Sequence, residues 1–380
     1  MKILITTDLF TTATNGVVTS VRNLWNELKA GGHEVRILTL SDTAKSHKDG
    51  AVYYIRSIPI GVYPNVRMPT SYRHRLIREL IDWQPNVIHS QCEFFTFQYA
   101  LRISKLTNTP IVHTYHTLYE RYVTYVIPFE RFGRCAVRFL VKKRLKRVKT
   151  VVVPTRKAEE TLRGYGMENK LRVVPTGIDL EQHQRRITPA QRAEKRKALG
   201  IADGQTVLLS LGRLGTEKNL EELLHYFSDA IRENDRLIFL IVGDGPAKEQ
   251  LQKLSAALGI SGRVIFTGMV QPSEVQDYYQ LGDLFVSAST SETQGLTYIE
   301  AAANGLPLLC RRDPCLKDVI IQGQNGYEYT CEREFLDALH IAVTDHDWSA
   351  AAGKRSQEVA AAFDRKAFGA AMEEIYESLL

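Results

Sequence analysis

The chain has 380 residues, of which 44% are hydrophobic and 24% are charged; this length leaves room for two domains, and the composition is typical of a soluble globular protein. No apolar run approaches the ~20 residues that a membrane-spanning helix needs, and the five cysteines form no Cys-x-x-Cys pair, which favours reduced thiols over a disulfide framework or a zinc site. The net charge of +6 conceals an asymmetry, because residues 1–180 contain 28 Lys and Arg against 14 Asp and Glu, whereas residues 181–380 contain 21 against 29. The basic first half is therefore expected to face a polyanion, such as nucleic acid or an anionic membrane surface.

Short apolar runs alternate with amphipathic stretches along the first half of the chain. The first apolar run begins within two residues of Met1 and is too short for the core of a signal peptide, so we expect a cytoplasmic protein. The pattern predicts buried strands at Ile3–Thr6, Val35–Leu40, Val87–His89, Ile111–Thr114, Val151–Pro154 and Leu171–Pro175. It predicts helices at Val18–Ala30, Tyr72–Trp83, Phe97–Leu106, Glu130–Lys149 and Arg156–Tyr165.

The second half repeats this alternation. Strands are predicted at Thr206–Leu211, Leu237–Val242, Val264–Thr267, Leu284–Ser287 and Pro307–Cys310, and helices over Gly295–Asn304 and residues 365–380. Alternating strands and helices of this length predict an α/β fold with two Rossmann-like domains, each with a parallel sheet covered by helices. The polar stretch Leu180–Arg196 is interpreted as a linker, which gives domains over residues 1–180 and 181–364, followed by the C-terminal helix at 365–380.

Two loops after predicted strands of the first half carry candidate binding residues. Asn15 and Gly16 permit a tight turn, and Gly16 leaves room for a ligand at the mouth of the sheet. His116 lies two residues beyond the strand Ile111–Thr114, where an imidazole can bind a hydroxyl group or move a proton. Lone histidines are more often structural, and that is the interpretation we favour for His113.

A basic tract follows this loop. It holds nine cations and no acid: Arg131, Arg134, Arg138, Lys142, Lys143, Arg144, Lys146, Arg147 and Lys149. Apolar residues interleave at helical spacing, which predicts an interfacial helix attracted to anionic lipid by ~1 kcal/mol per basic residue. A shorter segment with Arg73, Arg75 and Arg78 repeats the pattern. The alternative, an ordinary core stripe with a solvated basic face, stays open; nucleic acid is not expected, because no recognition motif accompanies the charge.

Loops of the second half carry residues suited to a phosphorylated ligand. Arg213 and Lys218 follow the strand Thr206–Leu211, at the carboxyl end where open α/β sheets bind ligands. Two cations there can neutralise a diphosphate without a metal, although two solvated surface cations are the alternative. Gly243, Asp244 and Gly245 close the next strand in a turn that allows close backbone approach. No dinucleotide fingerprint and no P-loop motif is present, which argues against a dehydrogenase or a P-loop enzyme.

The run Ser-Glu-Thr-Gln-Gly-Leu-Thr-Tyr-Ile-Glu, residues 291–300, is the most informative stretch. It places Glu292 on a strand-to-helix loop and Glu300 about two turns into the helix that follows. The backbone amides of Gly295 and Leu296 are predicted to be unpaired donors at the positive end of that helix, where phosphate oxygens bind. The two carboxylates would then lie near opposite ends of a nucleotide sugar. The alternative is a glutamate pair that only caps and solvates the helix.

This run resembles the Ser-Glu-Thr-x-Gly-Leu-x-x-x-Glu-Ala signature of the retaining glycosyltransferases of family 4, which have the two-domain GT-B fold, and Gly-Arg-x-x-x-x-Lys-Asn at 212–219 resembles their second motif. The resemblance implies that Glu292 contacts the transferred sugar, Glu300 the ribose, and Arg213 and Lys218 the diphosphate. It implies that His116 contacts the sugar and that the C-terminal helix packs back on the first domain. The implied catalytic residues are His116, Glu292, Arg213 and Lys218. The remaining implied donor-binding residues are Gly16, Gly243, Asp244, Gly245, Met269, Val270, Gln294, Gly295, Leu296, Thr297 and Glu300.

Within this family, the chain is similar to the diacylglycerol glucosyltransferases of bacterial membranes. The similarity rests on Asn-Gly-Val-Val-Thr-Ser-Val at 15–21, His-Thr-Tyr-His-Thr-x-Tyr-Glu-x-Tyr at 113–122, and Gln294 in place of the commoner aromatic residue. It implies UDP-glucose as donor, 1,2-diacylglycerol as acceptor, an α-linked glucolipid as product, no metal or other cofactor, and peripheral attachment to the inner face of the cell membrane. The implied acceptor and membrane residues are Asn15, Gly16, Val17, Tyr119, Tyr122, Arg73, Arg75, Arg78, Arg138, Lys142, Lys143, Arg144, Lys146 and Arg147.

Other interpretations remain at this point. A family 4 transferase with a soluble saccharide or small-molecule acceptor would keep the donor site, and so would an enzyme that adds a second sugar to a glycosylated diacylglycerol. A GT-B sugar-nucleotide epimerase would act with no acceptor, and an extracytoplasmic sugar-binding protein would carry an export signal. Glucose and galactose differ at one stereocentre, so the motifs leave the transferred sugar open.

Overall fold

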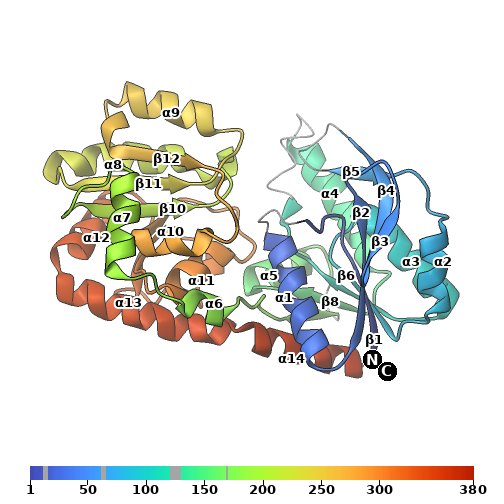
Figure 1. Ribbon diagram of the computed structural model, residues 1–380. Helices are drawn as coiled ribbons and strands as arrows, with labels where there is room; N and C mark the ends of the chain where they lie inside the picture. Colours follow the sequence, from blue (N-terminus) through green and yellow to red (C-terminus); the bar gives the residue numbers. More distant parts are fainter. Residues whose placement is uncertain (12–15, 61–65, 120–129, 168–169) are drawn as a thin grey trace. The chain divides into compact units, whose positions relative to one another are not determined.

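The computed structural model describes residues 1–11, 16–60, 66–119, 130–167 and 170–380. The chain divides into two compact units (Figure 1). The first unit comprises Met1–Gly177 together with Arg365–Leu380, and the second comprises Ile178–Asp364.

The first unit is built on a sheet with the strand order β3-β4-β2-β1-β6-β7-β8-β9. The pairs from β4 through β2, β1, β6, β7 and β8 to β9 are parallel, whereas β3 and β5 each pair with β4 antiparallel. The strands are β1 (Lys2–Thr6), β2 (Glu34–Ser41), β3 (His47–Asp49), β4 (Val52–Pro59), β5 (Arg67–Pro69), β6 (Val87–Ser90), β7 (Ile111–Thr114), β8 (Thr150–Val153) and β9 (Leu171–Val173).

Helices cover both faces of this sheet because successive strand residues point to opposite sides. In β1, Ile3 and Ile5 pack with α1 and α14, whereas Leu4 packs on the other side with α2, α3, α4 and α5. The central strands β1, β6, β7 and β8 are therefore almost completely buried, as is typical of a parallel sheet that is covered on both faces. The helices are α1 (Gly16–Ala30), α2 (Arg75–Asp82), α3 (Phe95–Thr107), α4 (Glu130–Leu145), α5 (Arg156–Gly164) and α14 (Arg365–Glu377).

The C-terminal helix α14 belongs to the first unit and lies against α1 (Figure 1). A Cβ atom at Gly369 would come within 2.7 Å of the Glu27 Cβ, so the glycine permits close contact between the two helices. Arg365 forms an ion pair with Glu27 at 2.8 Å, and the Tyr376 hydroxyl lies 2.6 Å from the His89 Nδ1 in the core. These contacts tie α14 to α1 and β6.

The second unit contains a parallel sheet with the order β12-β11-β10-β13-β14-β15. Helices α8, α9 and α12 pack on one face, and α10, α11 and α13 pack on the other. The strands are β10 (Thr206–Leu211), β11 (Leu237–Val242), β12 (Val264–Gly268), β13 (Leu284–Ser287), β14 (Leu308–Arg311) and β15 (Gly326–Tyr329). The helices are α6 (Leu180–Gln184), α7 (Pro189–Ala198), α8 (Leu220–Glu233), α9 (Lys248–Ala257), α10 (Val275–Leu281), α11 (Leu296–Ala303), α12 (Glu332–Thr344) and α13 (His346–Ala360).

In each sheet, successive strands are first added toward one edge and later toward the other, so there is one reversal point between two central strands. In the first unit this point lies between β1 and β6, and in the second it lies between β10 and β13. Open α/β sheets bind ligands beyond the carboxyl ends of the strands at such a point. The loops after β1, β6, β10 and β13 are therefore the expected places for functional side chains.

The predicted α/β class with two parallel sheets is confirmed, and three details of the prediction are wrong. The polar stretch interpreted as a linker forms α6 and α7, and a capping box at Thr188 with Pro189 at the first helical position starts α7. The basic helix ends at Leu145 instead of Lys149, because the chain must turn there to enter β8. Strands β3, β4, β5 and β15 were not predicted. Among the described residues, no helix combines the length and apolarity needed to cross a membrane.

Candidate active site

The loops after β10 and β13 bring together the cations and the first glutamate predicted for a sugar nucleotide. Arg213, Lys218, Glu292 and Thr297 all line one small pocket at the carboxyl ends of these two adjacent strands. The Lys218 ammonium donates to the Glu292 carboxylate, and the Arg213 guanidinium donates to Glu217. The two cations are thus held at the reversal point of the sheet by acidic partners of the same unit.

The loop after β13 fixes the position of Glu292. The Ser289 hydroxyl donates to the Glu292 Oε1 at 2.9 Å, and the Ser291 hydroxyl donates to the backbone oxygen of Glu217 at 3.2 Å. The second of these bonds ties the β13 loop to the short 3₁₀ turn Thr216–Lys218 that ends with Lys218. Gln294, in the same loop, is buried. Glu292 and Lys218 therefore belong to one hydrogen-bonded assembly.

Helix α11 begins directly after this loop, at Leu296. Gly295 precedes it with φ +76°, and a Cβ atom there would lie 2.4 Å from the Tyr298 ring, so only glycine fits this cap. Gly295 has no side chain that could cap the helix, and anion binding by the amides at the positive end of α11 stays a prediction. Glu300, the fifth residue of α11 and hence just over one turn in, accepts a hydrogen bond from the buried Tyr279 hydroxyl at 2.7 Å.

The turn after β11 packs directly against the loop that carries Arg213. Gly243 has φ +132°, and a Cβ atom there would lie 2.0 Å from the backbone oxygen of Gly212. The Leu214 amide donates to the Asp244 backbone oxygen at 2.9 Å, and a Cβ atom at Gly245 would lie 2.4 Å from the backbone oxygen of Leu214. Both glycines therefore serve close contact between two loops of the site. A hydrogen bond from Lys248 at 2.8 Å lowers the pKa of the Asp244 carboxyl.

The last predicted donor residues follow β12. Met269 is 77% exposed, whereas Val270 is partly buried and packs against the core. Gly243 pairs with Gly268 through a 3.1 Å backbone hydrogen bond, so this segment lies next to the turn after β11. Apart from Gly16, which begins α1 in the first unit, the predicted donor residues thus occupy the carboxyl ends of four neighbouring strands, β12, β11, β10 and β13, or the start of α11.

In the first unit, His116 lies after β7 and is partly buried. Its Nε2 lies 2.6 Å from the Oε1 of the buried Gln91, which directly follows β6. Burial, with a smaller contribution from His113, lowers the pKa of His116 to about 3. The ring is therefore neutral at physiological pH. His113 is fully buried with its Nε2 2.9 Å from Glu93, which agrees with a structural role.

Glu93 and Asp8 are two further polar residues at this edge of the first sheet. Glu93 is 1% exposed and also accepts from the Tyr119 hydroxyl. Asp8, in the loop after β1, accepts from the Phe95 and Thr96 amides at 3.2 and 2.7 Å. It thereby caps α3, whose own N-cap residue Phe94 makes no side-chain bond. Burial raises the pKa of Asp8.

The predicted acceptor loop is described only in part. Gly16 is the first residue of α1 and Val17 packs against the core beside it. Asn15 and Tyr122 lie outside the described residues. Tyr119 is tied to Glu93 and makes an edge contact with Phe94 at 5.1 Å, so its hydroxyl holds the loop in place.

The basic tract has one face in the core and one face exposed. Val141 and Leu145 are buried, whereas Phe139 and Leu140 are 69% and 40% exposed beside exposed cations. Arg138 donates to the Gly164 backbone oxygen, and Arg144 donates to that of Phe94. Each of these guanidinium groups therefore makes a hydrogen bond within the protein. The other predicted cations with exposed or partly exposed side chains are Arg73, Arg75, Arg78, Lys142, Lys143, Lys146 and Arg147.

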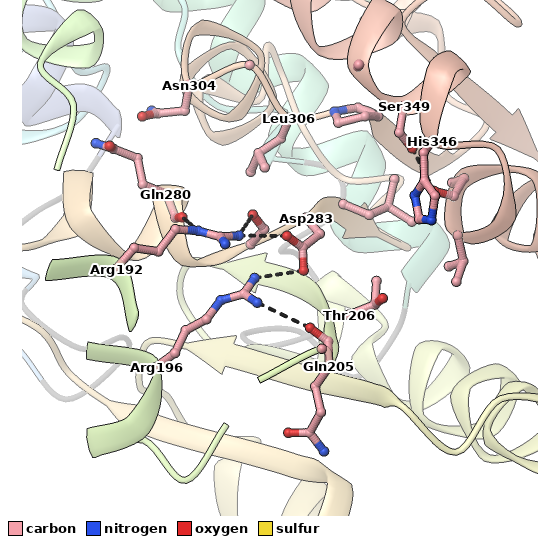
Figure 2. A pocket seen from close by; sticks show the side chains of 18 of the residues that line it. Arg192, Arg196, Gln205, Thr206, Gln280, Asp283, Asn304, Leu306, His346 and Ser349 are labelled. Carbon is pink, nitrogen blue, oxygen red and sulfur yellow. Dashed lines mark hydrogen bonds and ion pairs between the residues drawn. The ribbon is translucent and has the colours of Figure 1, made fainter. Parts of the chain in front are cut away.

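A larger pocket of the second unit, about 690 Å³, lies at the opposite edge of the sheet, near the amino ends of β10, β13 and β14 (Figure 2). Two arginines of α7 enter it and share Asp283: the Arg192 Nη2 lies 2.6 Å from Oδ1, and the Arg196 Nη2 lies 2.7 Å from Oδ2. Arg196 also donates to the backbone oxygen of Leu281 at the end of α10. These bonds secure α7 to the sheet, and the predicted donor residues lie elsewhere.

The sequence analysis missed Gln91, Glu93 and Asp8. All three follow the first or second strand at the reversal point of the sheet, and this position is the only signal that could have identified them. Their partners are 20 to 88 residues away in the chain, so no local spacing connects them.

Comparison with known proteins places the chain in a family. Residues 14–182 match the model of Glycosyltransferase Family 4, and residues 191–359 match that of Glycosyl transferases group 1. The chain is 36% identical over 341 residues to the alpha-monoglucosyldiacylglycerol synthase of Streptococcus pneumoniae, covering 89% of this chain and 77% of that one. It is 31% identical over 351 residues to the protein of the same name from Acholeplasma laidlawii, covering 90% and 88%.

Solved structures agree in fold. Anabaena HepE, in complex with UDP and glucose, superposes with a TM-score of 0.78 at 17% identity over all of both chains. Sucrose-phosphate synthase of Thermosynechococcus elongatus superposes with a TM-score of 0.78 at 21% identity, covering 100% of this chain and 98% of that one. The family models and the sequence relatives show that the chain belongs to the family 4 glycosyltransferases, and the solved structures show that it has the GT-B fold.

Proposed function

We propose that this enzyme transfers glucose from UDP-glucose to the free hydroxyl of 1,2-diacylglycerol and forms an α-glucosyl glycolipid. The sequence identity to two alpha-monoglucosyldiacylglycerol synthases supports diacylglycerol as the acceptor, and this identity extends through both units. A sugar-nucleotide donor is supported by the position of Arg213, Lys218 and Glu292, which lie together at the reversal point of the second sheet. A diphosphate and a sugar need cations and a carboxylate side by side, and this pocket offers both.

Arg213, Lys218 and the amides of Gly295 and Leu296 bind the donor diphosphate. In the structure Lys218 and Arg213 donate to Glu292 and Glu217, so donor binding exchanges part of these contacts for phosphate oxygens. Glu292 then turns to the sugar hydroxyls. Glu300, held by Tyr279, accepts from the ribose hydroxyls. Arg213 and Lys218 supply the charge neutralisation that a metal ion supplies in other transferases.

The transfer step breaks the bond between the anomeric carbon and the diphosphate oxygen and forms a bond from that carbon to the lipid hydroxyl oxygen. The hydroxyl attacks from the face that the diphosphate leaves, and its proton passes to the departing diphosphate, so the configuration is retained without a protein nucleophile. Negative charge builds on the diphosphate during this step. Cations and amides that are already in place stabilise it, which is the electrostatic effect expected to be largest in enzymes. In the first unit, the neutral His116 is the side chain that we propose to bind a hydroxyl group of the substrates.

The first unit binds the inner face of the cell membrane peripherally. Exposed Phe139 and Leu140 on α4, next to Lys143, provide apolar and basic groups on one helix. Helices of this kind lie in the membrane interface and are attracted to anionic lipid. Arg73, Arg75 and Arg78 add cations near the start of α2. Access to diacylglycerol then follows from the position of the enzyme on the bilayer.

The test is UDP release from UDP-glucose in mixed vesicles with and without diacylglycerol, and with and without anionic phospholipid. We expect release only with diacylglycerol, and faster release with anionic lipid. Parallel reactions contain monoglucosyldiacylglycerol or soluble saccharides, and UDP-galactose replaces UDP-glucose in a matched set. Equal turnover without diacylglycerol, or turnover only with a soluble acceptor, would refute the lipid acceptor while leaving the donor site intact.

A further inference from the structure

Gln91 occupies a defined place at the reversal point of the first sheet. It directly follows β6, and its backbone amide donates to the Thr6 oxygen of the neighbouring β1 at 2.8 Å. The residue is 2% exposed. Its backbone is therefore fixed by the two central strands, and its side chain cannot move freely.

The side chain of Gln91 makes one hydrogen bond among the described residues, to His116. Its Oε1 lies 2.6 Å from the His116 Nε2, and its own Nε2 is buried without a partner in that part of the chain. A buried amide normally satisfies both its donor and its acceptor. Core packing alone does not call for an amide at this position, because an apolar side chain of the same shape would leave no donor unpaired.

We propose that Gln91 is a positioning residue that fixes the tautomer of His116. The Gln91 carbonyl oxygen accepts the hydrogen of His116 Nε2, which leaves a lone pair on Nδ1. That lone pair accepts a hydrogen bond from a hydroxyl group of the bound sugar or of the acceptor. The inference rests on the proposed function for the identity of the hydroxyl, whereas the tautomer follows from the Gln91 contact itself.

The surroundings support this assignment. An acceptor role requires a neutral ring, and burial lowers the pKa of His116 to about 3. The neighbouring His113 is already committed, because its Nε2 contacts Glu93, and Glu93 is held in turn by Tyr119. His113 therefore cannot take over the role of His116. The two histidines therefore differ in their hydrogen-bond partners: His113 contacts a carboxylate and His116 contacts a carboxamide.

The experiment is ¹⁵N NMR of the imidazole nitrogens in the full-length protein without substrate, with His116 assigned by its loss in His116→Gln. We expect a protonated Nε2 and an unprotonated Nδ1. In Gln91→Met, which keeps the shape but removes the acceptor, this preference is lost; in Gln91→Glu, which keeps an oxygen acceptor, Nε2 stays protonated. A wild-type ring protonated on Nδ1, or an unchanged tautomer in Gln91→Met, would overturn the proposal.

Kinetics separate this inference from the proposed function. With UDP-glucose and diacylglycerol vesicles, Gln91→Met should lower kcat roughly 10-fold, as expected when one positioned hydrogen bond to the reacting groups is lost, and leave KM for UDP-glucose within about twofold. Thr109→Val removes a buried hydrogen bond to the Pro85 oxygen at the other end of β7 and is the matched control; its kcat should stay near that of the wild type. If no lipid is glucosylated, the proposed function fails, but the NMR result still decides the tautomer.

Discussion

Replacement of Gly243 by alanine tests how the loops of the donor site are held together. The new Cβ atom would lie 2.0 Å from the Gly212 oxygen and 3.0 Å from its carbonyl carbon, and both are backbone atoms that no rotamer change can move. The φ of +132° adds strain for any residue with a Cβ atom. A positive φ costs about 1–2 kcal/mol, and overpacking costs about 1–3 kcal/mol, so we expect a loss of about 2–5 kcal/mol in the free energy of unfolding of the second unit.

Gly259→Ala is the matched control. Gly259 has φ +71°, and a Cβ atom there meets nothing within 4 Å, so this variant incurs the conformational cost alone. Urea-dependent hydrogen exchange of peptides from β10 and β11, followed by mass spectrometry, measures the stability of the second unit in both variants. Calorimetric titration with UDP measures the consequence for the site, because the clash displaces the loop that carries Arg213. If Gly243→Ala is no less stable than Gly259→Ala and binds UDP as tightly as the wild type, the reasoning is refuted.

Three further predictions concern the ribose contact, the neutral histidine and the membrane surface. Tyr279→Phe removes the bond that orients Glu300, which we expect to cost ~1 kcal/mol and to raise KM for UDP-glucose roughly fivefold; Tyr278→Phe is the control, and an unchanged KM would contradict this role. In the folded protein the pKa of His116 is about 3, below its ordinary 6.5. Between these two pH values the unfolded chain therefore binds more protons than the folded protein. The free energy of unfolding then decreases as the pH falls from 6.5 towards 3. Urea unfolding of His116→Gln should therefore show a shallower fall in stability from pH 7 to pH 4 than the wild type, and a parallel fall would count against it. Neutralising three exposed cations of the basic tract should lower the affinity for anionic vesicles, measured by sedimentation, about 100-fold, because each cation contributes ~1 kcal/mol. Neutralising three exposed lysines of the second unit should have little effect. Equal losses of affinity in the two sets would contradict membrane binding by the basic tract. The test set is Lys143→Gln, Lys146→Gln and Arg147→Gln, and the control set is Lys197→Gln, Lys317→Gln and Lys354→Gln.

Central strands and their loops could be predicted from the sequence because burial on both faces leaves an unbroken apolar run. Strands β10, β11 and β13 have the predicted bounds, and the pocket residues Arg213, Lys218 and Glu292 lie on the loops where they were expected. The strands β3 and β5 lack that signal, because they are three residues each and carry no apolar run.

What could not be predicted depends on partners that are distant in the sequence. The polar stretch at 180–196 is secured to the second unit through α7, because Arg192 and Arg196 bind Asp283, about 90 residues later. The contact between Gln91 and His116 arises only when β6 and β7 pair in the sheet. In α4, the periodicity marked an apolar stripe, but only the packed structure distinguishes the core residue Val141 from the exposed Phe139.

The most direct test of the central claim is the structure of the lipid product. Purified enzyme is incubated with UDP-glucose labelled with ¹³C in the sugar and with vesicles that contain diacylglycerol and anionic phospholipid, and the extracted lipids are examined by mass spectrometry and NMR. The account predicts one labelled hexose on diacylglycerol, with the small anomeric proton coupling of an α-linkage. A β-linked product, or label confined to free glucose or to a water-soluble glycoside, would contradict it.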